Sequence, residues 1–319
     1  MDRRGARAVT ARTPIALTIA GSDSGGGAGI QADLKTFAAL GVHGASAVTA
    51  LTAQNTRGVA SIHVAPPAIV RAQIDAVLDD FDVRAIKIGM LGSAEVAEAV
   101  AASLPSPLAG EGQGVRGRRA SAWPATGTLR RDPSSGQASP GHLPTQGGKG
   151  GGPFIVYDPV LVASSGDALA GAGFVAAVTA RLLPLVDCLT PNLAEAAALL
   201  GAPIAASEDE MAAQGRALMA LGPRAVLMKG GHLAGAEAVD LLIAADGVRR
   251  FAAPRLASPN LHGTGCTLSS AIAGYIAFGD DLPEAVAAAK AFVGAAIERG
   301  RDVKFGQGAG PLIPIPLRG

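Results

Sequence analysis

The chain has 319 residues, of which 49% are hydrophobic but only 3% aromatic, so a large core must be built from Ala, Val, Leu and Ile. The net charge of +1 gives no global reason to expect binding to nucleic acid or to an anionic membrane. Two cysteines provide no disulfide framework, and no apolar run reaches the length of a membrane span. These features predict a cytoplasmic protein without nucleic-acid or membrane partners. Residues 1–13 are Arg- and Ala-rich without an apolar signal core and are expected to form a disordered leader.

Short apolar runs alternate with helical patterns over residues 14–319, which predicts a single domain of βα units around a mostly parallel sheet. The predicted strands are Ile15–Ala20, Ala45–Leu51, Ala85–Gly89, Phe154–Asp158, Val186–Thr190 and Ala225–Lys229. After the first strand, an apolar stripe with helical spacing ends before Gly41. Its members are Ile30, Leu34, Phe37 and Ala38. Later, Val239–Ala244 and Val248–Ala253 flank Asp246-Gly247, which predicts an antiparallel hairpin at one edge of the sheet.

A segment from about Pro105 to Gly152 breaks this pattern. It is rich in Gly, Pro, Ser and Arg, and it separates a predicted helix, Ser93–Ser103, from the next strand, where a few residues normally suffice. The six basic and two acidic residues of the segment account for the positive charge, since the rest holds 21 basic against 24 acidic residues. We interpret residues 105–152 as a low-complexity surface insertion without a role in the chemistry.

A glycine-rich loop follows the first strand, from Gly21 to Gln31. It fits neither the dinucleotide-binding fingerprint, because its glycine spacing and acidic residue are misplaced, nor a phosphate-binding Walker loop, because no Gly-Lys-Ser/Thr follows. Its glycines do allow the backbone to approach a flat ligand closely. Asp33, expected in the first turn of the next helix, either interacts with the helix dipole or contacts a ligand.

Gln54 follows the second predicted strand and offers one hydrogen-bond acceptor beside one donor. This pair matches an aminopyrimidine, whose ring nitrogen accepts while its exocyclic amine donates. A solvated surface glutamine is the alternative interpretation.

Three further strand ends are polar where the strands are apolar: Asp158, the run Thr190–Glu195, and Lys229. Ligands of open α/β sheets bind at the carboxyl ends of the strands. Carboxylates order Mg²⁺ and a lysine neutralises phosphate, so their convergence predicts a magnesium–nucleotide site. Each residue alone could instead be a helix cap or part of a salt bridge.

The turn from Gly263 to Cys266 opens a helix of small residues. Its unpaired amides and the positive helix end predict an anion site, and the same field is expected to stabilise the Cys266 thiolate. The alternative is a flexible glycine turn followed by a core cysteine.

Together and in this order, the motifs resemble those of the hydroxymethylpyrimidine/phosphomethylpyrimidine kinases of thiamin biosynthesis, which are ribokinase-like. They are Gly21–Lys35, Ala53–Asn55, Lys87–Leu91, Asp158–Val160, Thr190–Glu195, Lys229–His232 and His262–Thr267. The resemblance implies a three-layer α/β/α fold and a homodimer. It also implies ATP- and Mg²⁺-dependent phosphorylation of 4-amino-5-hydroxymethyl-2-methylpyrimidine to the monophosphate and then to the diphosphate.

The resemblance also implies roles for individual residues. The pyrimidine pocket would be lined by Gly21, Ala28, Asp33, Gln54, Met90 and Val160. ATP and its phosphates would be bound by Asn192, Lys229 and Gly265, and Mg²⁺ by Asp158 and Glu195. Catalysis would depend on Lys229 and on the anion hole Gly263, Thr264, Gly265 and Cys266. Many ribokinase relatives carry an aspartate base where Cys266 stands, which leaves the base in this chain open.

Two other functions compete with this hypothesis. A pyridoxal or pyridoxine kinase is one, because some relatives with a cysteine in this turn accept that ring too. A catalytically silent pyrimidine-binding sensor is the other. A sensor needs no residues for phosphate transfer, so Asn192, Glu195 and Lys229 argue against it.

The cysteine is expected to matter unequally in the two phosphorylations. The first nucleophile is an alcohol that must lose a proton, whereas the second is a phosphate oxygen that is already ionised near neutral pH. Cys266→Ala should therefore slow the first reaction far more than the second, and Cys266→Asp should recover part of the first. Turnover measured separately for each step checks this. Equal losses would make Cys266 a structural residue of the turn.

Overall fold

The computed structural model describes residues 13–105, 151–161, 173–231 and 233–315. Most of the predicted leader and most of the predicted insertion lie outside these residues. None of the described helices is long and apolar enough to cross a membrane.

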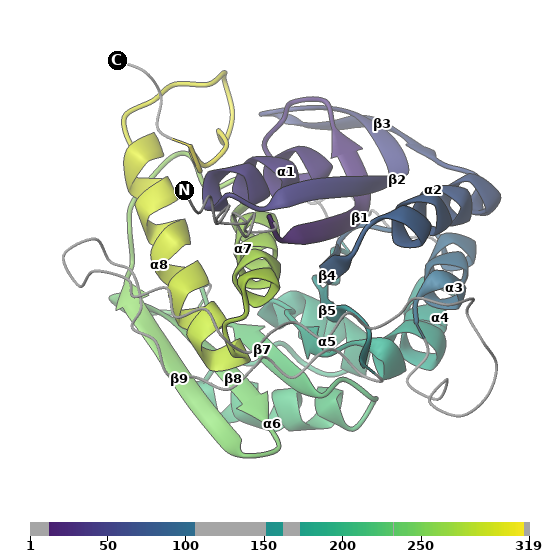
Figure 1. Cartoon of the computed structure of the whole chain (residues 1–319). Helices are drawn as coiled ribbons and strands as arrows, with labels where there is room; N and C mark the ends of the chain where they lie inside the picture. Colours follow the sequence, from purple (N-terminus) through teal and green to yellow (C-terminus); the bar gives the residue numbers. More distant parts are fainter. Residues whose placement is uncertain (1–12, 106–150, 162–172, 232, 316–319) are drawn as a thin grey trace, which may run out of the picture.

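Nine described strands form one sheet in the order β3-β2-β1-β4-β5-β6-β7-β8-β9 (Figure 1). Their bounds are β1 Ile15–Asp23, β2 His43–Asn55, β3 Gly58–Val64, β4 Val83–Ile88, β5 Phe154–Tyr157, β6 Cys188–Leu189, β7 Ala225–Lys229, β8 Glu237–Ala244 and β9 Gly247–Pro254. The six strands from β2 to β7 in this order are parallel, and antiparallel pairs close both edges. The predicted parallel strands and the β8–β9 hairpin are confirmed.

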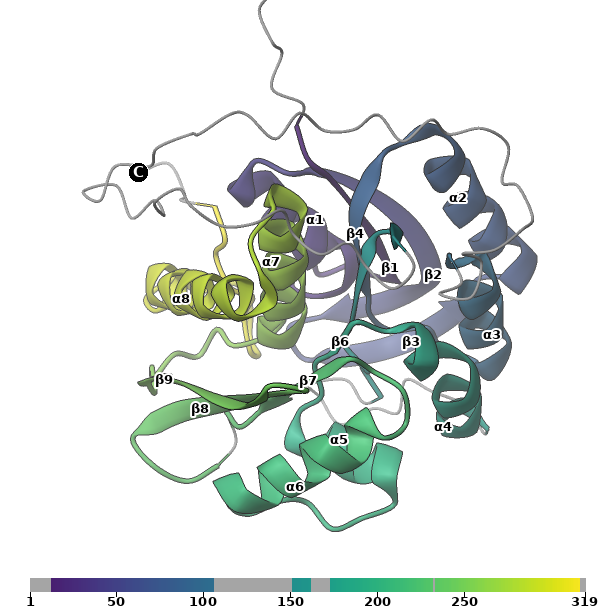
Figure 2. The ribbon, with the colours of Figure 1, turned by 60° about the horizontal axis from the view of Figure 1, so that its bottom comes forward.

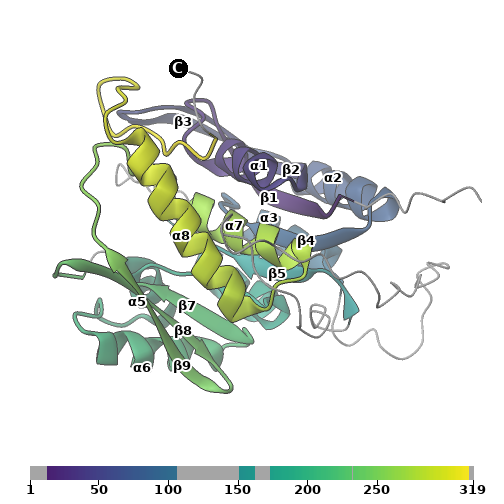
Figure 3. The same ribbon diagram turned by 60° about the vertical axis from the view of Figure 1, so that its left-hand side comes forward.

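Helices cover both faces of this sheet (Figure 2). They are α1 Gly29–Leu40, α2 Pro67–Asp80, α3 Ala94–Ser103, α4 Phe174–Ala177, α5 Leu193–Leu200, α6 Glu208–Met219, α7 Thr264–Phe278 and α8 Leu282–Gly300. One layer contains α1, α7 and α8, while α2 to α6 lie on the other side. Figure 3 shows α8 lying across the sheet from the β3 end toward the β9 end. The α/β fold expected from the motifs is confirmed.

The alternation of side chains along the strands divides the core into two parts. In β1, Leu17 and Ile19 pack toward α2 and α3, whereas Ala16 packs toward α7. Small residues such as Ala16 let α7 lie close to the sheet. Gly274 of α7 is similarly close-packed, because a Cβ there would come within 2.8 Å of Leu40. This explains why α7 is composed of small residues on most of its surface.

Two details differ from the sequence prediction. First, β2 extends to Asn55 and turns into β3, which forms a second antiparallel edge that the sequence analysis missed. Second, α1 begins at Gly29, so Asp33 is its fifth residue and not part of its first turn. The buried face of α1 includes Asp33, whereas Ala38 of the predicted apolar stripe is exposed. A hydrophobic pattern could not show this rotation, because a buried carboxylate requires a partner from elsewhere in the fold.

The two ends of the predicted insertion lie together. A Cβ added to Gly152 would be 3.2 Å from the Cβ of Pro105, directly between the end of α3 and the start of β5. Replacing residues 105–152 by a short Gly/Ser linker should therefore preserve folding and the kinase activity that the resemblance implies. Loop closure over about fifty residues costs only on the order of 1–2 kcal/mol more than over a short loop. Thermal unfolding and an ADP-release assay check this. A folded but inactive shortened protein would place the insertion in the site.

Candidate active site

The polar residues predicted at the strand ends meet at one edge of the sheet. Lys229, at the end of β7, binds the Asp158 carboxylate with a Nζ–Oδ1 distance of 2.6 Å. Its Nζ lies 3.8 Å from Glu195 Oε2. These three side chains are at most 14% exposed. The structure thus brings together the lysine and both carboxylates that the sequence predicted as one site.

Asn192 and Glu195 form a reciprocal cap at the start of α5. The Asn192 side chain accepts a hydrogen bond from the Glu195 amide at 2.9 Å, and the Glu195 carboxylate accepts one from the Asn192 amide at 2.8 Å. The backbone at Asn192 also bridges to Lys229 of β7. The capping role that the sequence left open is therefore present, and the cap fixes Glu195 beside the lysine.

Asp158 and Glu195 place two carboxylates beside the single positive charge of Lys229. Burial raises the pKa of Glu195 above its usual range, Lys229 opposes this, and Asp158 raises it further. No group of three or more His, Cys, Asp or Glu side chains in the described residues could hold a metal ion alone. Mg²⁺, however, is commonly held by one or two carboxylates together with substrate phosphates and water. The donor set of Asp158 and Glu195 fits that arrangement.

The start of α7 faces the same cluster. Gly263 caps the helix with a φ of 82°, and a Cβ there would collide with the Gly27 carbonyl oxygen. A Cβ at Gly265 would lie 3.1 Å from Lys229 Nζ and 3.4 Å from Asp158 Oδ2. Among the described residues no side chain caps this helix, and the Thr264 hydroxyl turns back to the Leu261 carbonyl. The Thr264 amide also donates to the Leu261 carbonyl, at 3.3 Å, and the amides that follow it in this first turn face an anion position beside a lysine.

The surroundings of Cys266 favour the thiol over the expected thiolate. Burial raises the pKa of the Cys266 thiol to about 11; Lys87 lowers it, Asp33 and Asp158 raise it, and a Gly29 amide lowers it. The prediction of a thiolate stabilised by the helix end is therefore wrong, because desolvation outweighs the nearby positive charge. A base role for Cys266 requires that bound ligands change this balance.

Predicted pocket residues form a small apolar cluster of their own. Met90 packs with Ala50, and Ile62 and Val160 pack against them. A Cβ added to Gly21 would come within 3.3 Å of the Met90 methyl group, so this glycine keeps the cluster open on the β1 side. The structure thus brings Gly21, Met90 and Val160 together, as expected for the wall of a ring pocket.

Asp33 lies beneath this region and is completely buried. Both of its oxygens lie 2.9 Å from Lys87 Nζ, and the hydroxyls of Thr18 and Ser270 each donate to it at 2.6 Å. A carboxylate enclosed by four hydrogen bonds has no open face toward a ligand. The structure therefore does not expose Asp33 for the predicted pyrimidine contact, because its carboxylate is fully occupied by partners within the protein.

Lys87 opens the quoted motif Lys87–Leu91, but the sequence analysis assigned it no role, and the structure shows it as the buried partner of Asp33. It is completely buried; burial lowers its pKa, but the charges of Asp33, Cys266 and Asp158 raise the pKa above its usual range. The available signal was a lysine inside the apolar strand β4, since such a charge must be paired.

Gln54 and Ala28 belong to a polar network around the glycine loop. The Gln54 amide lies 3.2 Å from His262 Nε2, which lies 3.2 Å from Asp23 Oδ2. The same Asp23 oxygen accepts the Ala28 amide proton at 2.8 Å. Neither Asp23 nor His262 was singled out from the sequence, although both stand inside its quoted motifs.

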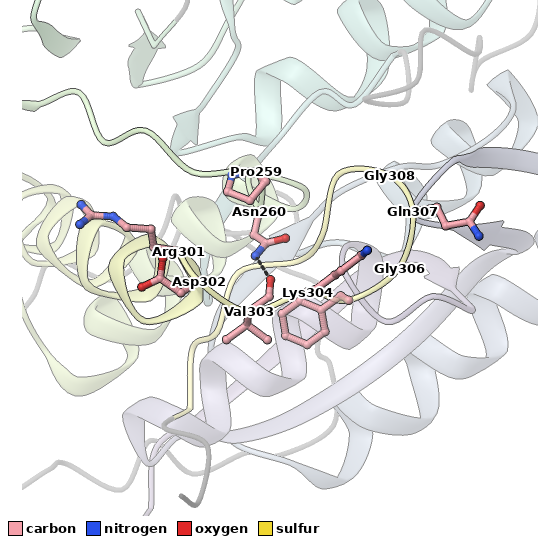
Figure 4. A pocket seen from close by; sticks show the side chains of 10 residues that line it. Pro259, Asn260, Arg301, Asp302, Val303, Lys304, Gly306, Gln307 and Gly308 are labelled. Carbon is pink, nitrogen blue, oxygen red and sulfur yellow. Dashed lines mark hydrogen bonds between the residues drawn. The ribbon is translucent and has the colours of Figure 1, made fainter.

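A separate hollow of about 560 Å³ lies at the C-terminal loop (Figure 4). Residues 259–260 and 301–308 line it, and Asn260 closes its base by donating to the Val303 carbonyl. None of the predicted site residues lines this hollow. The chemistry is therefore assigned to the sheet edge, not to this hollow.

Comparison with known proteins decides the family. The sequence profile described as phosphomethylpyrimidine kinase matches residues 23–110 and 148–313. The chain belongs to this kinase family. A hydroxymethylpyrimidine/phosphomethylpyrimidine kinase of Rhizobium meliloti is 49% identical over 94% of this chain and 96% of its own. The gap in the profile match falls within the segment predicted as an insertion.

Solved structures agree with this kinase fold. A phosphomethylpyrimidine kinase from Clostridium difficile matches with a TM-score of 0.66 and 36% identity, over 89% of this chain and 100% of that one. An ADP complex of Bacillus subtilis pyridoxal kinase matches with a TM-score of 0.73 and 29% identity, over 95% and 97%.

Removing the buried lysine should destabilise the whole domain. Lys87→Met leaves the Asp33 carboxylate buried without its counter-charge, so we expect a loss of about 3–5 kcal/mol in the free energy of unfolding. Urea denaturation measures this. Lys290→Met is the matched control, because Lys290 pairs with Asp240 at 2.6 Å in a site that is partly exposed. A loss at Lys87 no larger than at Lys290 would contradict the role assigned to the buried pair.

Proposed function

We propose that this protein is a bifunctional kinase of thiamin biosynthesis. It phosphorylates 4-amino-5-hydroxymethyl-2-methylpyrimidine with ATP, and then phosphorylates the monophosphate to the diphosphate. The observation that carries the proposal is the cluster of Lys229, Asp158 and Glu195 against the open start of α7. Family membership supplies the substrate class.

The pyrimidine is proposed to bind between the apolar cluster around Met90 and the glycine loop. Gly21 and Ala28 allow the backbone to approach the ring, while Val160 covers its apolar part. Gln54 pairs with the aminopyrimidine edge, the polar contact that fixes the ring in the pocket. The hydroxymethyl group is then directed to the start of α7.

Phosphate transfer is proposed to depend on charge and position. Lys229 neutralises ATP phosphates, Asn192 contributes to their binding, and the amides of Gly263, Thr264, Gly265 and Cys266 stabilise the charge on the transferred group. Asp158 and Glu195 would hold Mg²⁺ through carboxylate oxygens and ordered water. When bound, this ion neutralises the charge that develops on the phosphate oxygens. Its removal with a chelator should abolish turnover.

A pyridoxal kinase is the second candidate, favoured by the structural likeness to the Bacillus subtilis enzyme. The higher identity to pyrimidine kinases places it second. We further propose a homodimer in the cytoplasm, which size-exclusion chromatography with light scattering and cell fractionation test.

The decisive experiment measures ADP release with the pyrimidine, its monophosphate and pyridoxal in parallel. We expect turnover with the first two, and a kcat/KM for pyridoxal that is lower by at least about tenfold. Efficient turnover of pyridoxal alone would make the protein a pyridoxal kinase. Binding of the pyrimidine without any ADP release would make it a sensor.

Variants that remove charge from the cluster of Lys229, Asp158 and Glu195 test phosphate transfer separately from pyrimidine binding. Lys229→Met should lower kcat by at least about 100-fold, because a charge that stabilises the transferred phosphoryl group is lost. Glu195→Gln should raise the Mg²⁺ concentration required for half-maximal rate. Calorimetry should show nearly unchanged pyrimidine affinity in both variants. Unaltered Mg²⁺ dependence in folded Glu195→Gln would remove this residue from the metal site.

A further inference from the structure

A chain of polar side chains connects the glycine loop to Gln54. Asp23 is 3% exposed and His262 13% exposed, and their Oδ2 and Nε2 atoms lie 3.2 Å apart. The Gln54 amide follows at 3.2 Å from the same Nε2, and its other end lies 3.1 Å from Thr52 Oγ1. Thr52 Oγ1 is itself 3.0 Å from the Ser22 carbonyl oxygen. The four side chains come from β1, β2 and the segment before α7.

Asp23 can only accept hydrogen bonds. Its Oδ2 accepts the amide protons of Gly27 and Ala28, and its Oδ1 accepts that of Gly25. Burial raises its pKa, but the hydrogen bond to His262 and these loop amides outweigh this and lower it, which keeps the group ionised. The proton between Asp23 and His262 therefore resides on His262 Nε2, which is a donor.

This donor fixes the orientation of the Gln54 amide. As placed, the amide directs its nitrogen at His262 Nε2, so that two donors face each other, and the single Thr52 hydroxyl proton is shared between two acceptors. The two ends of an amide are distinguished only by such partners. Turning the amide by 180° removes the contact between two donors. The Gln54 oxygen then shares the His262 Nε2 proton with Asp23, the Gln54 nitrogen donates to Thr52, and Thr52 donates to the Ser22 carbonyl alone.

We propose that Asp23 and His262 are positioning residues that hold the Gln54 amide oxygen toward His262, so that the protein reads the aminopyrimidine edge in one orientation only. This inference rests on the proposed function, and it adds residues to which no role in recognition has been assigned above. With one lone pair held by His262 and one amide proton held by Thr52, Gln54 keeps one acceptor and one donor for the ring.

The orientation of the Gln54 amide matters because the hydroxymethyl group, which is phosphorylated, is adjacent to the ring edge that pairs with Gln54. The hydroxymethyl carbon is attached beside the amino carbon of the pyrimidine. If the amide turned over, donor and acceptor would exchange places, and the ring would have to turn over to remain paired. The hydroxymethyl group would then leave the start of α7. Pyridoxal has no amine beside a ring nitrogen, so its binding does not depend on this amide in the same way.

Three variants remove or retain the orienting hydrogen bonds. His262→Leu removes the donor, whereas His262→Gln keeps an N–H donor at a comparable reach. Thr52→Val removes the hydroxyl that receives the amide proton, with little change in shape. His63→Leu is the control, since His63 is an exposed histidine on the same β2–β3 hairpin.

We expect His262→Leu to raise the KM for the pyrimidine by about five- to tenfold, with a smaller change in the KM for pyridoxal. His262→Gln should recover part of this loss, Thr52→Val should raise the KM by about threefold, and His63→Leu should have no effect. Gln54→Leu serves as the second background. If His262 acts through Gln54, His262→Leu should add no further pyrimidine KM effect in the Gln54→Leu protein.

The result that overturns the proposal is the same KM increase from His262→Leu in both backgrounds, because a merely structural role does not depend on Gln54. An unchanged KM in all His262 and Thr52 variants overturns it as well. Failure of the proposed function gives a different result: the wild-type protein then shows no turnover of the pyrimidine at all. If His262→Leu does not fold, the comparison of His262→Gln and Thr52→Val in the two backgrounds decides in the same way.

Discussion

The ion pair between Asp33 and Lys87 is the constraint on which the site depends. Both side chains have no exposed surface, so leaving either charge alone in the core would be strongly unfavourable. Thr18 of β1 and Ser270 of α7 complete the hydrogen bonds of the carboxylate. One buried group thus ties α1 to β1, β4 and α7, and the glycine loop lies between β1 and α1 while the turn from Gly263 to Cys266 opens α7.

Close backbone contact then fixes the loop against the turn. Gly27 lies under the His262 ring, and the Gly27 carbonyl occupies the space that a Cβ of Gly263 would need. Gly263 has a left-handed backbone conformation, which glycine adopts without the steric cost of a side chain. The glycines of both motifs are therefore explained by contact between them. A ligand held by one motif is consequently held at a defined distance from the other.

Two buried charge clusters with different tasks lie close together. The Asp33–Lys87 pair is internally neutral and hydrogen-bonded on all sides, which makes it a structural element. The cluster of Asp158, Glu195 and Lys229 has one more negative charge than positive, and burial raises the pKa of Glu195. Cys266 lies in the field of both, and burial raises the pKa of its thiol most, while Lys87 lowers this pKa and Asp33 and Asp158 raise it.

The sequence by itself determined the order of strands and helices, because alternating apolar runs and glycine breaks are local signals. It also identified Lys229, Asp158 and Glu195, since polar residues at the ends of parallel strands must meet at one sheet edge. It could not determine the partner of Asp33, the inward rotation of α1 or the edge strand β3. These depend on contacts between residues far apart in the chain, such as Lys87 with Asp33 and His262 with Asp23. Only the tertiary structure decided which buried charge is compensated and by which group, because the free energy of a buried charge depends on neighbours that local sequence patterns do not encode.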